Sequence, residues 1–478
     1  MASSTSLELS SLVVPLGEVW NRNNLIWNDF SPAGNLSEHV SPFDGRVIQK
    51  SHVLSPPDLS ALFGFPASSA HWTESDIYAF THRLQLELQD LAPALREATQ
   101  LETAFSATDC EEIVEGTLSY LKGFFDYYSQ VSPLASVTLN YEAENNGAPP
   151  VQRKIVLKSC PWGTVVVMMP QNAVLLIGVI CLLNALITGN RVVLRAPLQG
   201  ARTAALLACA VARAEPPQNS VSIVVAKGRE FLDAAHASPL PLLIHYLGAS
   251  QFGGDILKNA FTGQKPALID GTGNTWVWVG DKSDPFQVAE LLLQGATRYN
   301  GQTCTSINGA IIHPSIYEEV SQGLQKRWSQ LQVGKLFDEQ QAKMCLERVL
   351  HSSGQTLCGG HASGNELEPT LVANPHPESE LVREGIFGPV LWIQPGTKDD
   401  FISRWPSNHY PLCVGVLDGT VDEQWWLARL PNLARLVING DPSVEHIYEP
   451  WGGYPASGSN EVGFWHQKYQ RTVSLDTL

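Results

Sequence analysis

Apolar residues recur along this chain with two different spacings, which predict where helices and strands lie. From residue 74 to residue 130 they recur every three to four positions, which predicts helices, and Thr73-Glu-Ser-Asp76 has the composition of a helix start. Residues 1–70 are polar and are expected to be irregular, except for a hairpin at 41–48 around the turn Asp44-Gly45. We interpret the first 130 residues as scaffold.

From residue 160 onward, strand-like and helix-like segments alternate, and the same alternation repeats in 277–440. Strands that alternate with helices specify a parallel sheet, so the sequence predicts an α/β fold. Glycine-rich turns at the ends of such strands are where a nucleotide binds. The expected segments of the first part are strands 163–169, 191–195, 222–226 and 244–247 and helices 175–186, 202–212 and 255–261.

Two segments with little core-forming content are expected to build a protruding β-arm. Residues 136–158 are predicted to form two strands around a polar loop at Asn145-Asn-Gly147. The extended tail at 470–475 is suited to pair with them. Because exposed strand edges are usually covered in native proteins, we expect a partner subunit to cover this arm.

Length and charge narrow the class of protein. The 478 residues exceed what one core needs, so two or three domains are expected. The formal charge of −16 and the lack of basic clusters argue against nucleic acid or an anionic membrane as a partner. The most apolar run, 165–194, is interrupted by Pro170 and by asparagines, which argues against a bilayer span. With no signal-peptide pattern before Arg22, we expect a cytoplasmic protein.

The cysteines indicate a reducing compartment rather than a metal site. No two of them form a CxxC pair, and none has a histidine at zinc-ligand spacing, so no bound metal is expected. Several lie inside apolar runs, as reduced core thiols do. The eight are at positions 110, 160, 181, 209, 304, 345, 358 and 413.

Cys304 has a setting unlike that of a core thiol. It lies in the polar run Arg298-Tyr-Asn-Gly-Gln-Thr-Cys-Thr-Ser306, between a helix predicted in 285–297 and a strand predicted in 310–313. A free cysteine is usually a small core residue. A thiol on a polar turn between regular elements is instead where a nucleophile can meet a substrate, given groups that favour the thiolate.

The sequence evidence for a cofactor-binding turn is weaker than the evidence for a reactive thiol at Cys304. No GxGxxG motif follows the first strand of the α/β region, so the usual dinucleotide fingerprint is absent. The turn Gly248-Ala-Ser-Gln-Phe-Gly253 opens a helix and is the better pyrophosphate candidate, although short glycine turns are common in any α/β protein.

Six motifs, in order and spacing, make nearly the whole chain resemble the aldehyde dehydrogenases. Any one of the motifs is weak, but six in the right order are strong. They are Pro170-Gln-Asn172, Gly189-Asn-Arg-Val-Val-Leu-Arg195, Gly248-Ala-Ser-Gln-Phe-Gly253, Gly301-Gln-Thr-Cys304, Phe387-Gly-Pro389 and Gly452-Gly-Tyr-Pro-Ala-Ser-Gly458.

The resemblance implies a fold and a domain plan. It implies a Rossmann-like NAD(P)-binding domain in 1–135 and 159–276 and a catalytic domain in 277–442. An oligomerisation arm would consist of 136–158 and 443–478, and it would make a homodimer or homotetramer.

The resemblance also implies chemistry. Cys304 would attack a small-molecule aldehyde, and the Asn172 amide with the Cys304 backbone N–H would hold the oxyanion. Hydride would pass to NAD or NADP, leaving a thioester on Cys304. The alternative role of the Asn172 amide is merely to cap a turn. The cofactor contacts that the resemblance implies are Met169, Pro170, Arg195, Gly248, Ala249, Ser250, Gly253, Gly271, Glu384 and Phe387.

The main departure from the family concerns the base that activates water. Hydrolytic members carry a Glu where this chain has Ile269, in the run Ile269-Asp-Gly-Thr-Gly-Asn274. Asp270 is adjacent, but neighbouring side chains of an extended segment point to opposite faces, so Asp270 serves only if the backbone shifts. The Gly-x-Gly-Asn form resembles the branch of the family that handles acyl-CoA or acyl-phosphate.

Other departures affect the cofactor site. Leu198 replaces a Glu that would repel a 2′-phosphate, so Leu198 and Arg195 permit NADP, unless Arg195 simply replaces a lysine on the ribose. In the family, a Glu holds the nicotinamide ribose. The residue of this chain at that position is Gly385, and Glu384 lies one residue before it. Gln171 replaces a tryptophan beside the substrate passage, which makes that passage more polar.

Three functions compete. The first is NAD(P)-dependent oxidation of an aldehyde to a carboxylic acid through Cys304. The second is an acylating dehydrogenase or reductase that works with CoA or a carrier thiol, in which an acyl thioester is the substrate or product; Ile269 favours it. The third is a repurposed, non-catalytic binding member, favoured by the weakened contacts at Leu198 and Gly385.

Overall fold

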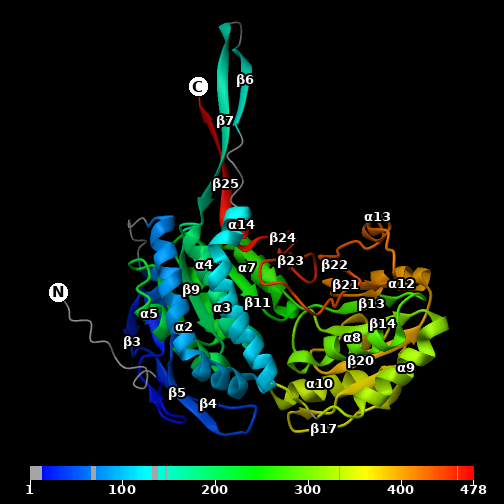
Figure 1. Cartoon of the computed structure of the whole chain (residues 1–478). Helices are drawn as coiled ribbons and strands as arrows, with labels where there is room; N and C mark the ends of the chain where they lie inside the picture. Colours follow the sequence, from blue (N-terminus) through cyan, green and yellow to red (C-terminus); the bar gives the residue numbers. More distant parts are fainter. Residues whose placement is uncertain are drawn as a thin grey trace.

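The computed structural model describes residues 13–65, 72–131, 138–145, 148–332, 334–459 and 461–477. The predicted loop centre at Asn146-Gly147 and the polar N-terminus before residue 13 lie outside the described residues. Two α/β bodies stand side by side, and a thin β-arm projects from the first (Figure 1). The predicted α/β fold is confirmed.

The first body is built on a sheet whose five central strands are parallel, in the order β12-β11-β8-β9-β10. Every residue of β8, β10 and β11 is buried, as expected for a parallel sheet covered on both faces. The strands are β8 (Thr164–Met168), β9 (Arg191–Ala196), β10 (Val221–Val225), β11 (Leu242–Leu247) and β12 (Ala267–Asp270), continued by the antiparallel β2 (Asn24–Ile26) and β3 (Asp29–Ser31).

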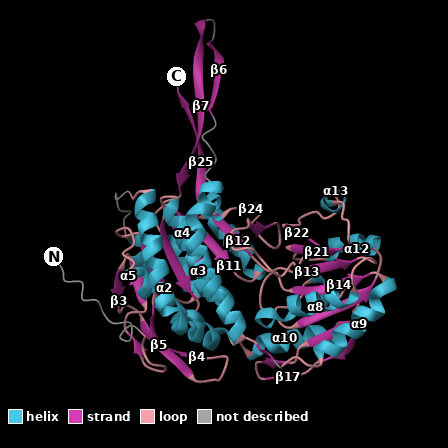
Figure 2. Cartoon of the chain, viewed as in Figure 1, coloured by secondary structure: helices cyan, strands magenta, loops and turns pink. Residues whose placement is uncertain are grey.

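Helices cover both faces of this sheet (Figure 2). One face packs on four helices, and the two longest of them start with capping boxes at Thr73 and Ser106, as predicted for the first. The other face packs on shorter helices. The first group is α2 (Glu74–Thr103), α3 (Ala107–Gln130), α4 (Val174–Ile187) and α5 (Ala201–Arg213), and the second is α1 (Pro56–Gly64), α6 (Gly228–Ala237) and α7 (Gly253–Thr262).

The expectation that residues 1–70 are irregular was wrong for most of the described part. Besides β2, β3 and α1, it holds a small sheet of β1 (Val19–Trp20), β5 (Val47–Val53) and β4 (Asn35–Val40). β1 and β4 pair with β5 within this segment, whereas β2 pairs with β10 of the first sheet, a contact that local sequence does not reveal. The hairpin predicted at 41–48 is confirmed as the β4–β5 connection.

The second body contains a seven-stranded sheet in the order β16-β19-β20-β14-β13-β21-β22, parallel except for β16. Alternate residues of β13 serve its two faces, so that Trp276 and Trp278 enter one core and Val277 and Val279 the other. The strands are β13 (Thr275–Val279), β14 (Ile307–Ile312), β16 (Gln355–Cys358), β19 (Thr370–Ala373), β20 (Val390–Pro395), β21 (Cys413–Leu417) and β22 (Arg435–Ile438).

Helices flank this second sheet as well, and a small three-stranded sheet lies beside it. The helices are α8 (Pro285–Thr297), α9 (Pro314–Trp328), α10 (Glu339–Leu350), α11 (Glu380–Arg383), α12 (Lys398–Arg404) and α13 (Glu423–Leu427), and the small strands are β15 (Gly334–Lys335), β17 (Ala362–Ser363) and β18 (Glu366–Leu367).

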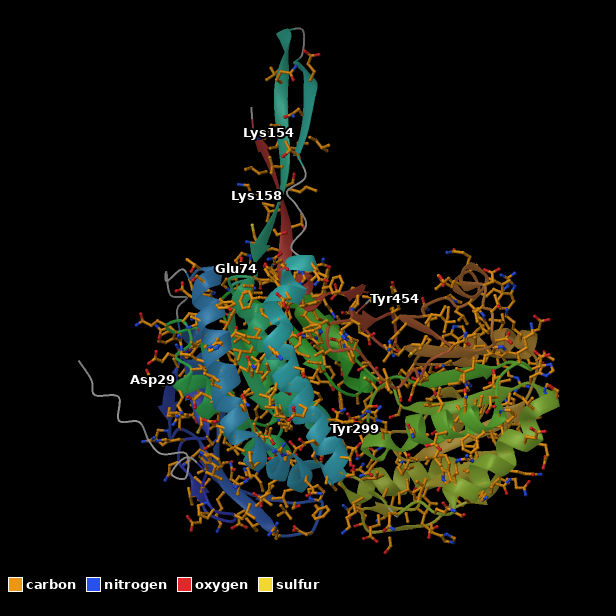
Figure 3. All side chains as sticks on the ribbon, in the orientation of Figure 1. Asp29, Glu74, Lys154, Lys158, Tyr299 and Tyr454 are labelled. Atoms are coloured by element: carbon orange, nitrogen blue, oxygen red, sulfur yellow. The ribbon has the colours of Figure 1, made fainter. Side chains whose placement is uncertain are left out.

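The arm is a three-stranded antiparallel sheet of β6 (Thr138–Asn145), β7 (Ala148–Pro161) and β25 (Gln470–Thr477). The predicted pairing of the C-terminal tail with the arm is confirmed, with Val473 opposite Lys158. Figure 3 labels Lys154 and Lys158 along the arm, well away from the body.

The rest of the segment 443–478 does not belong to the arm, which corrects the predicted boundary. Residues 441–450 form a loop after β22, and β23 (Trp451–Gly453) pairs with β24 (Glu461–Gly463). Gly458 bridges to Asp270 at the end of β12, and α14 (Trp465–Lys468) leads into the arm. This segment therefore closes over the region between the two bodies before it reaches β25.

Within the described ranges, no helix combines the length and apolar character needed to cross a bilayer. Nor do those ranges hold a group of three or more His, Cys, Asp or Glu side chains placed to bind a metal ion.

Candidate active site

Cys304 lies on a sharp turn between α8 and β14. In the preceding η5 (Arg298–Gly301), Tyr299, Asn300 and Gly301 all have positive φ, at 53°, 53° and 66°. At Gly301 a Cβ atom would lie 2.2 Å from the carbonyl oxygen of Gly388, so only glycine fits. The turn is therefore fixed by packing before the chain reaches the thiol.

The turn is also anchored to the first body. The Asn300 amide donates to the carbonyl oxygens of Ala104 and Lys335, at 3.0 and 2.9 Å. The Tyr299 hydroxyl donates to Glu112 on α3 at 3.0 Å, and Figure 3 labels Tyr299 where the two bodies meet. Cys304 is thus held at the junction of the bodies.

Asn172 reaches this turn from the first sheet. It lies in η2 (Gln171–Ala173), directly after β8, and its Nδ2 donates to the carbonyl oxygen of Gln302 at 3.1 Å. Asn172, far from Cys304 in the chain, therefore contacts the turn that carries Cys304. The neighbouring Gln171 side chain turns away and donates to the carbonyl of Glu102 at 3.0 Å.

The environment of Cys304 favours the neutral thiol. Burial raises the pKa of Cys304 well above its usual value, and the carboxylates of Glu445 and Asp270 raise it further. Its own backbone N–H acts in the opposite direction. A nearby base is therefore needed to make the reactive thiolate.

The run 271–274 packs directly against the Cys304 turn. A Cβ atom on Gly273 would lie 2.0 Å from the Cys304 carbonyl oxygen, and one on Gly271 would lie 2.3 Å from Ser250 Oγ. Both glycines are thus required by close approach, which gives the Gly-Thr-Gly-Asn run a packing reason that does not depend on the acyl acceptor.

The side chains of Ile269 and Asp270 are both buried and make their contacts within the protein interior. Ile269 is buried in the core beneath Gly253. Asp270 Oδ2 lies 2.6 Å from His245 Nε2, and Oδ1 lies 3.5 Å from Lys468 Nζ. Burial alone would raise the pKa of Asp270, but Lys468 and His245 together hold it below its usual value. A strongly paired carboxylate of low pKa is a weak base, so the role predicted for Asp270 gains no support from this arrangement.

The predicted cofactor residues gather at one edge of the first sheet, because the carboxyl ends of parallel strands share an edge. Met169 and Pro170 follow β8, Arg195 ends β9 and Gly248 follows β11. The Met169 N–H donates to the Arg195 carbonyl at 3.0 Å. Arg195 Nε donates to Ala226 at 2.8 Å, and burial lowers the pKa of Arg195 to about 10.

The turn 248–253 is tied to the nucleophile through the run 271–274. Ser250 and Thr272 exchange two hydrogen bonds, from the Thr272 N–H to Ser250 Oγ at 2.8 Å and from the Ser250 N–H to Thr272 Oγ1 at 3.1 Å. The Gly248 N–H donates to the Asp270 carbonyl, and Ala249 accepts from Tyr246. The glycine-bearing turns, the partly buried Arg195 and the uncharged Leu198 suit a dinucleotide with or without a 2′-phosphate.

The second half of the predicted cofactor site is arranged differently from expectation. Glu384 pairs with Arg348 of α10 at 2.6 Å and faces His409 at 3.7 Å. At Gly385, whose φ is 70°, a Cβ atom would lie 2.6 Å from Asn308 Oδ1 and 2.7 Å from Asn274 Oδ1. The position of the missing Glu thus has no room for a side chain.

Phe387 lies just beyond this glycine. Its ring is 6.1 Å from that of Phe337, and its carbonyl accepts from the Gln341 side chain at 2.8 Å. Its backbone is therefore fixed by α10.

Sequence reasoning missed Glu445. It lies in the loop 441–450, in which the Ser443 carbonyl accepts a hydrogen bond from the hydroxyl of Thr305, the residue after Cys304, at 3.4 Å. Thr305 and Glu445 line one cavity, together with Leu412, Cys413 and Arg435. No motif marks Glu445 in the sequence; the only available signal was an acidic residue in a loop before the Gly452-Gly-Tyr motif.

Comparison with known proteins agrees with this geometry. The model of the aldehyde dehydrogenase family matches residues 32–474. Peroxisomal aminoaldehyde dehydrogenase 1 of Pisum sativum is 24% identical over 409 residues, covering 79% of each chain. The 2,5-dioxopentanoate dehydrogenase of Saccharolobus solfataricus is 26% identical over 332 residues, 65% of this chain and 69% of the relative.

Solved structures share the fold over almost the full length. Aldehyde dehydrogenase 21 of Physcomitrella patens, in complex with succinate, superposes with a TM-score of 0.84 at 19% identity, covering 97% of this chain and 99% of the other. NADP-dependent glyceraldehyde-3-phosphate dehydrogenase of Bacillus halodurans, in complex with NADP, gives 0.81 at 20% identity, with 96% and 99% covered. This chain therefore belongs to the aldehyde dehydrogenase family and is an NAD(P)-dependent oxidoreductase.

Proposed function

We propose that this enzyme oxidises an aldehyde to the carboxylic acid through a thioester on Cys304, with water as the acyl acceptor. The observation that carries the proposal is the contact of the Asn172 amide with Gln302, two residues before Cys304. It brings an amide donor to the nucleophile turn, where the oxyanion of a thiohemiacetal would form.

Bound NAD or NADP supplies the hydride acceptor. Met169, Pro170, Arg195 and the turn 248–253 would hold its adenosine and pyrophosphate parts, with Phe387 near the other end. We favour NADP, because Arg195 is present and the carboxylate that would repel a 2′-phosphate is replaced by Leu198. The role of Glu384 in holding the ribose is not supported by its ion pair with Arg348.

The acylating reaction with CoA is the second candidate, and Ile269 in place of the usual base favours it. The Gly-Thr-Gly-Asn run counts less in its favour than the sequence suggested, because Gly271 and Gly273 are explained by packing. A family member that only binds ligands is the weakest candidate, since binding alone does not require an amide donor in contact with the turn of a cysteine.

We further propose that the arm joins subunits into a homodimer or homotetramer. The described part of the arm has exposed apolar side chains, among them Leu139, Leu157 and Leu475. An unpaired strand edge with such side chains is normally covered in native proteins.

A stopped-flow trace of NAD(P)H absorbance with a panel of aldehydes tests the proposal. Hydrolytic oxidation gives steady NAD(P)H formation without CoA, whereas the acylating reaction gives one equivalent and then stalls until CoA is added. Cys304→Ala should abolish both phases, and unchanged activity in this variant would refute both reactions. Absence of cofactor binding would support the binding member.

A further inference from the structure

Glu445 is presented to the nucleophile by a firmly held loop. Arg435 of β22 donates to the carbonyl oxygens of Pro442 and Val444, at 2.7 and 2.6 Å, and so fixes the loop on both sides of Ser443. Thr305 Oγ1 lies 3.4 Å from the Ser443 carbonyl oxygen. The loop is therefore docked on the Cys304 turn at the residue that follows the thiol.

Glu445 lines a cavity next to the turn that carries Cys304. Thr305, the residue after Cys304, lines the same cavity. Glu445 is also the first of the charged groups that raise the pKa of the Cys304 thiol, ahead of Asp270. Of the carboxylates discussed, it therefore has the strongest electrostatic effect on the thiol.

The other nearby carboxylates are already neutralised. Asp270 is paired with His245 and Lys468, Glu384 with Arg348, and Glu449 with Arg435 at 3.2 Å. Glu445 has no such ion pair within the described residues, although the charge of Arg435 lowers its pKa. A carboxylate without a dedicated cation keeps more of its basicity.

The groups around Glu445 set its proton affinity. Burial raises the pKa of Glu445 to about 8, Glu449 and Asp270 raise it, and Arg435 and the Thr305 hydroxyl lower it. Cys304 and Cys413 also face it, since Glu445 raises the pKa of both thiols. General bases work best when their pKa lies near the working pH.

We propose that Glu445 is the general base that activates water for hydrolysis of the Cys304 thioester, in place of the carboxylate missing at Ile269. The inference rests on the proposed function. The ionised Glu445 takes a proton from water while the water oxygen bonds to the acyl carbon. The C–S bond then breaks, the sulfur leaves as the Cys304 thiolate, and the product is the carboxylic acid. The proton on Glu445 returns to solvent or to the thiolate.

The test compares Glu445→Gln with the wild type in the stopped-flow assay with aldehyde and NADP, without CoA. The burst should persist, because it precedes hydrolysis, while the steady rate should fall about 10²–10⁴-fold. Intact-mass measurement should find the acyl group retained on the enzyme. Hydroxylamine, a nucleophile that needs no base, should restore turnover, and Glu445→Asp should keep part of the steady rate.

Glu449→Gln is the matched control, an amide replacement of the other carboxylate of the same loop. At a pH where both enzymes have reached their plateau, it should keep the wild-type ratio of burst to steady rate. Its steady rate should reach its plateau at lower pH, because removing Glu449 takes away a charge that raises the pKa of Glu445. Glu445→Gln should lose this pH dependence.

The outcomes are separable. If the wild type itself stalls after one equivalent without CoA, the proposed function fails. If the wild type turns over steadily and Glu445→Gln matches it, or if Glu445→Gln loses the burst as well, the assignment of Glu445 as the hydrolytic base is overturned while the proposed function stands. Circular dichroism of Glu445→Gln and Glu445→Asp verifies that each variant is folded.

Discussion

At the scale of single residues, Asp270 and Lys468 form the centre of a buried charge cluster. His245 bridges Tyr469 and Asp270, at 2.8 and 2.6 Å, and Lys468 Nζ faces Asp270 and also Glu461 at 4.0 Å. These groups join the end of β12 to α14 at the base of the arm. Removing one charge of such a cluster leaves the others buried without compensation.

Lys468→Met is therefore expected to lower the free energy of unfolding by about 3–5 kcal/mol at neutral pH. In the wild type the pKa of Asp270 is held low, so this group stabilises the fold above its unfolded pKa. Without Lys468 the pKa of Asp270 should rise, and the deficit should shrink as the pH falls and the carboxyl is protonated. Urea unfolding at a series of pH values measures this. A deficit that does not vary with pH would contradict it, and Asp270→Asn added to Lys468→Met should recover part of the loss.

Leu198 gives a second prediction at this scale. Leu198→Glu places a carboxylate where a 2′-phosphate would lie near Arg195, so the affinity for NADP should fall about ten-fold or more relative to NAD, which corresponds to about 1.4 kcal/mol. Leu198→Gln, which has the shape of Glu but no charge, should change the preference for NADP over NAD much less. Fluorescence titration with both cofactors measures the ratio, and an unchanged ratio in Leu198→Glu would exclude a 2′-phosphate at this place.

At the scale of elements, three turns meet at the active site and exclude side chains from one another. Gly301 lies against Gly388, Gly273 against the Cys304 carbonyl, and Gly385 against Asn274 and Asn308. With the asparagine amides at 274 and 308 filling the space, position 385 cannot carry the usual Glu.

Restoring the family residue with Gly385→Glu should therefore not tighten cofactor binding. Overpacking and the positive φ should together cost about 2–4 kcal/mol of stability. Gly364→Glu is the matched control, because Gly364 has a φ of 60° and no atom within 4 Å of the added Cβ, so only backbone strain of about 1–2 kcal/mol applies. Urea unfolding and cofactor titration provide the data, and an equal cost in the two variants would disprove the steric explanation.

At the scale of the whole molecule, the site exists only where the two bodies and the C-terminal segment meet. Asn172 comes from the first body, Cys304 from the second, and Glu445 from the loop that follows the last strand of the second sheet. The arm then carries the chain away from this junction, as Figure 1 shows. Exposed leucines on the arm are the surface through which we expect subunits to join.

Leu139→Asp combined with Leu157→Asp should weaken subunit association about 10–1,000-fold and shift the protein towards monomers. Leu139 pairs with Ile155, which lies two residues from Leu157, so the two changes fall on one face of the arm. Sedimentation velocity measures the shift. Leu36→Asp, an equally exposed leucine on β4 away from the arm, should leave the association state unchanged, and equal behaviour of all variants would refute a role for the arm.

The sequence by itself determined the alternation of strands and helices, the arm with its tail, the nucleophile turn and the family. These features depend on local periodicity, turn residues and short motifs, which are properties of neighbouring positions. Only the tertiary structure decided that Asp270 is neutralised by His245 and Lys468, that Gly385 has no room for a side chain, and that Glu445 lines a cavity with Thr305, the residue after Cys304. Each of these depends on contacts between residues far apart in the chain, and burial and charge at such contacts leave no trace in local spacing.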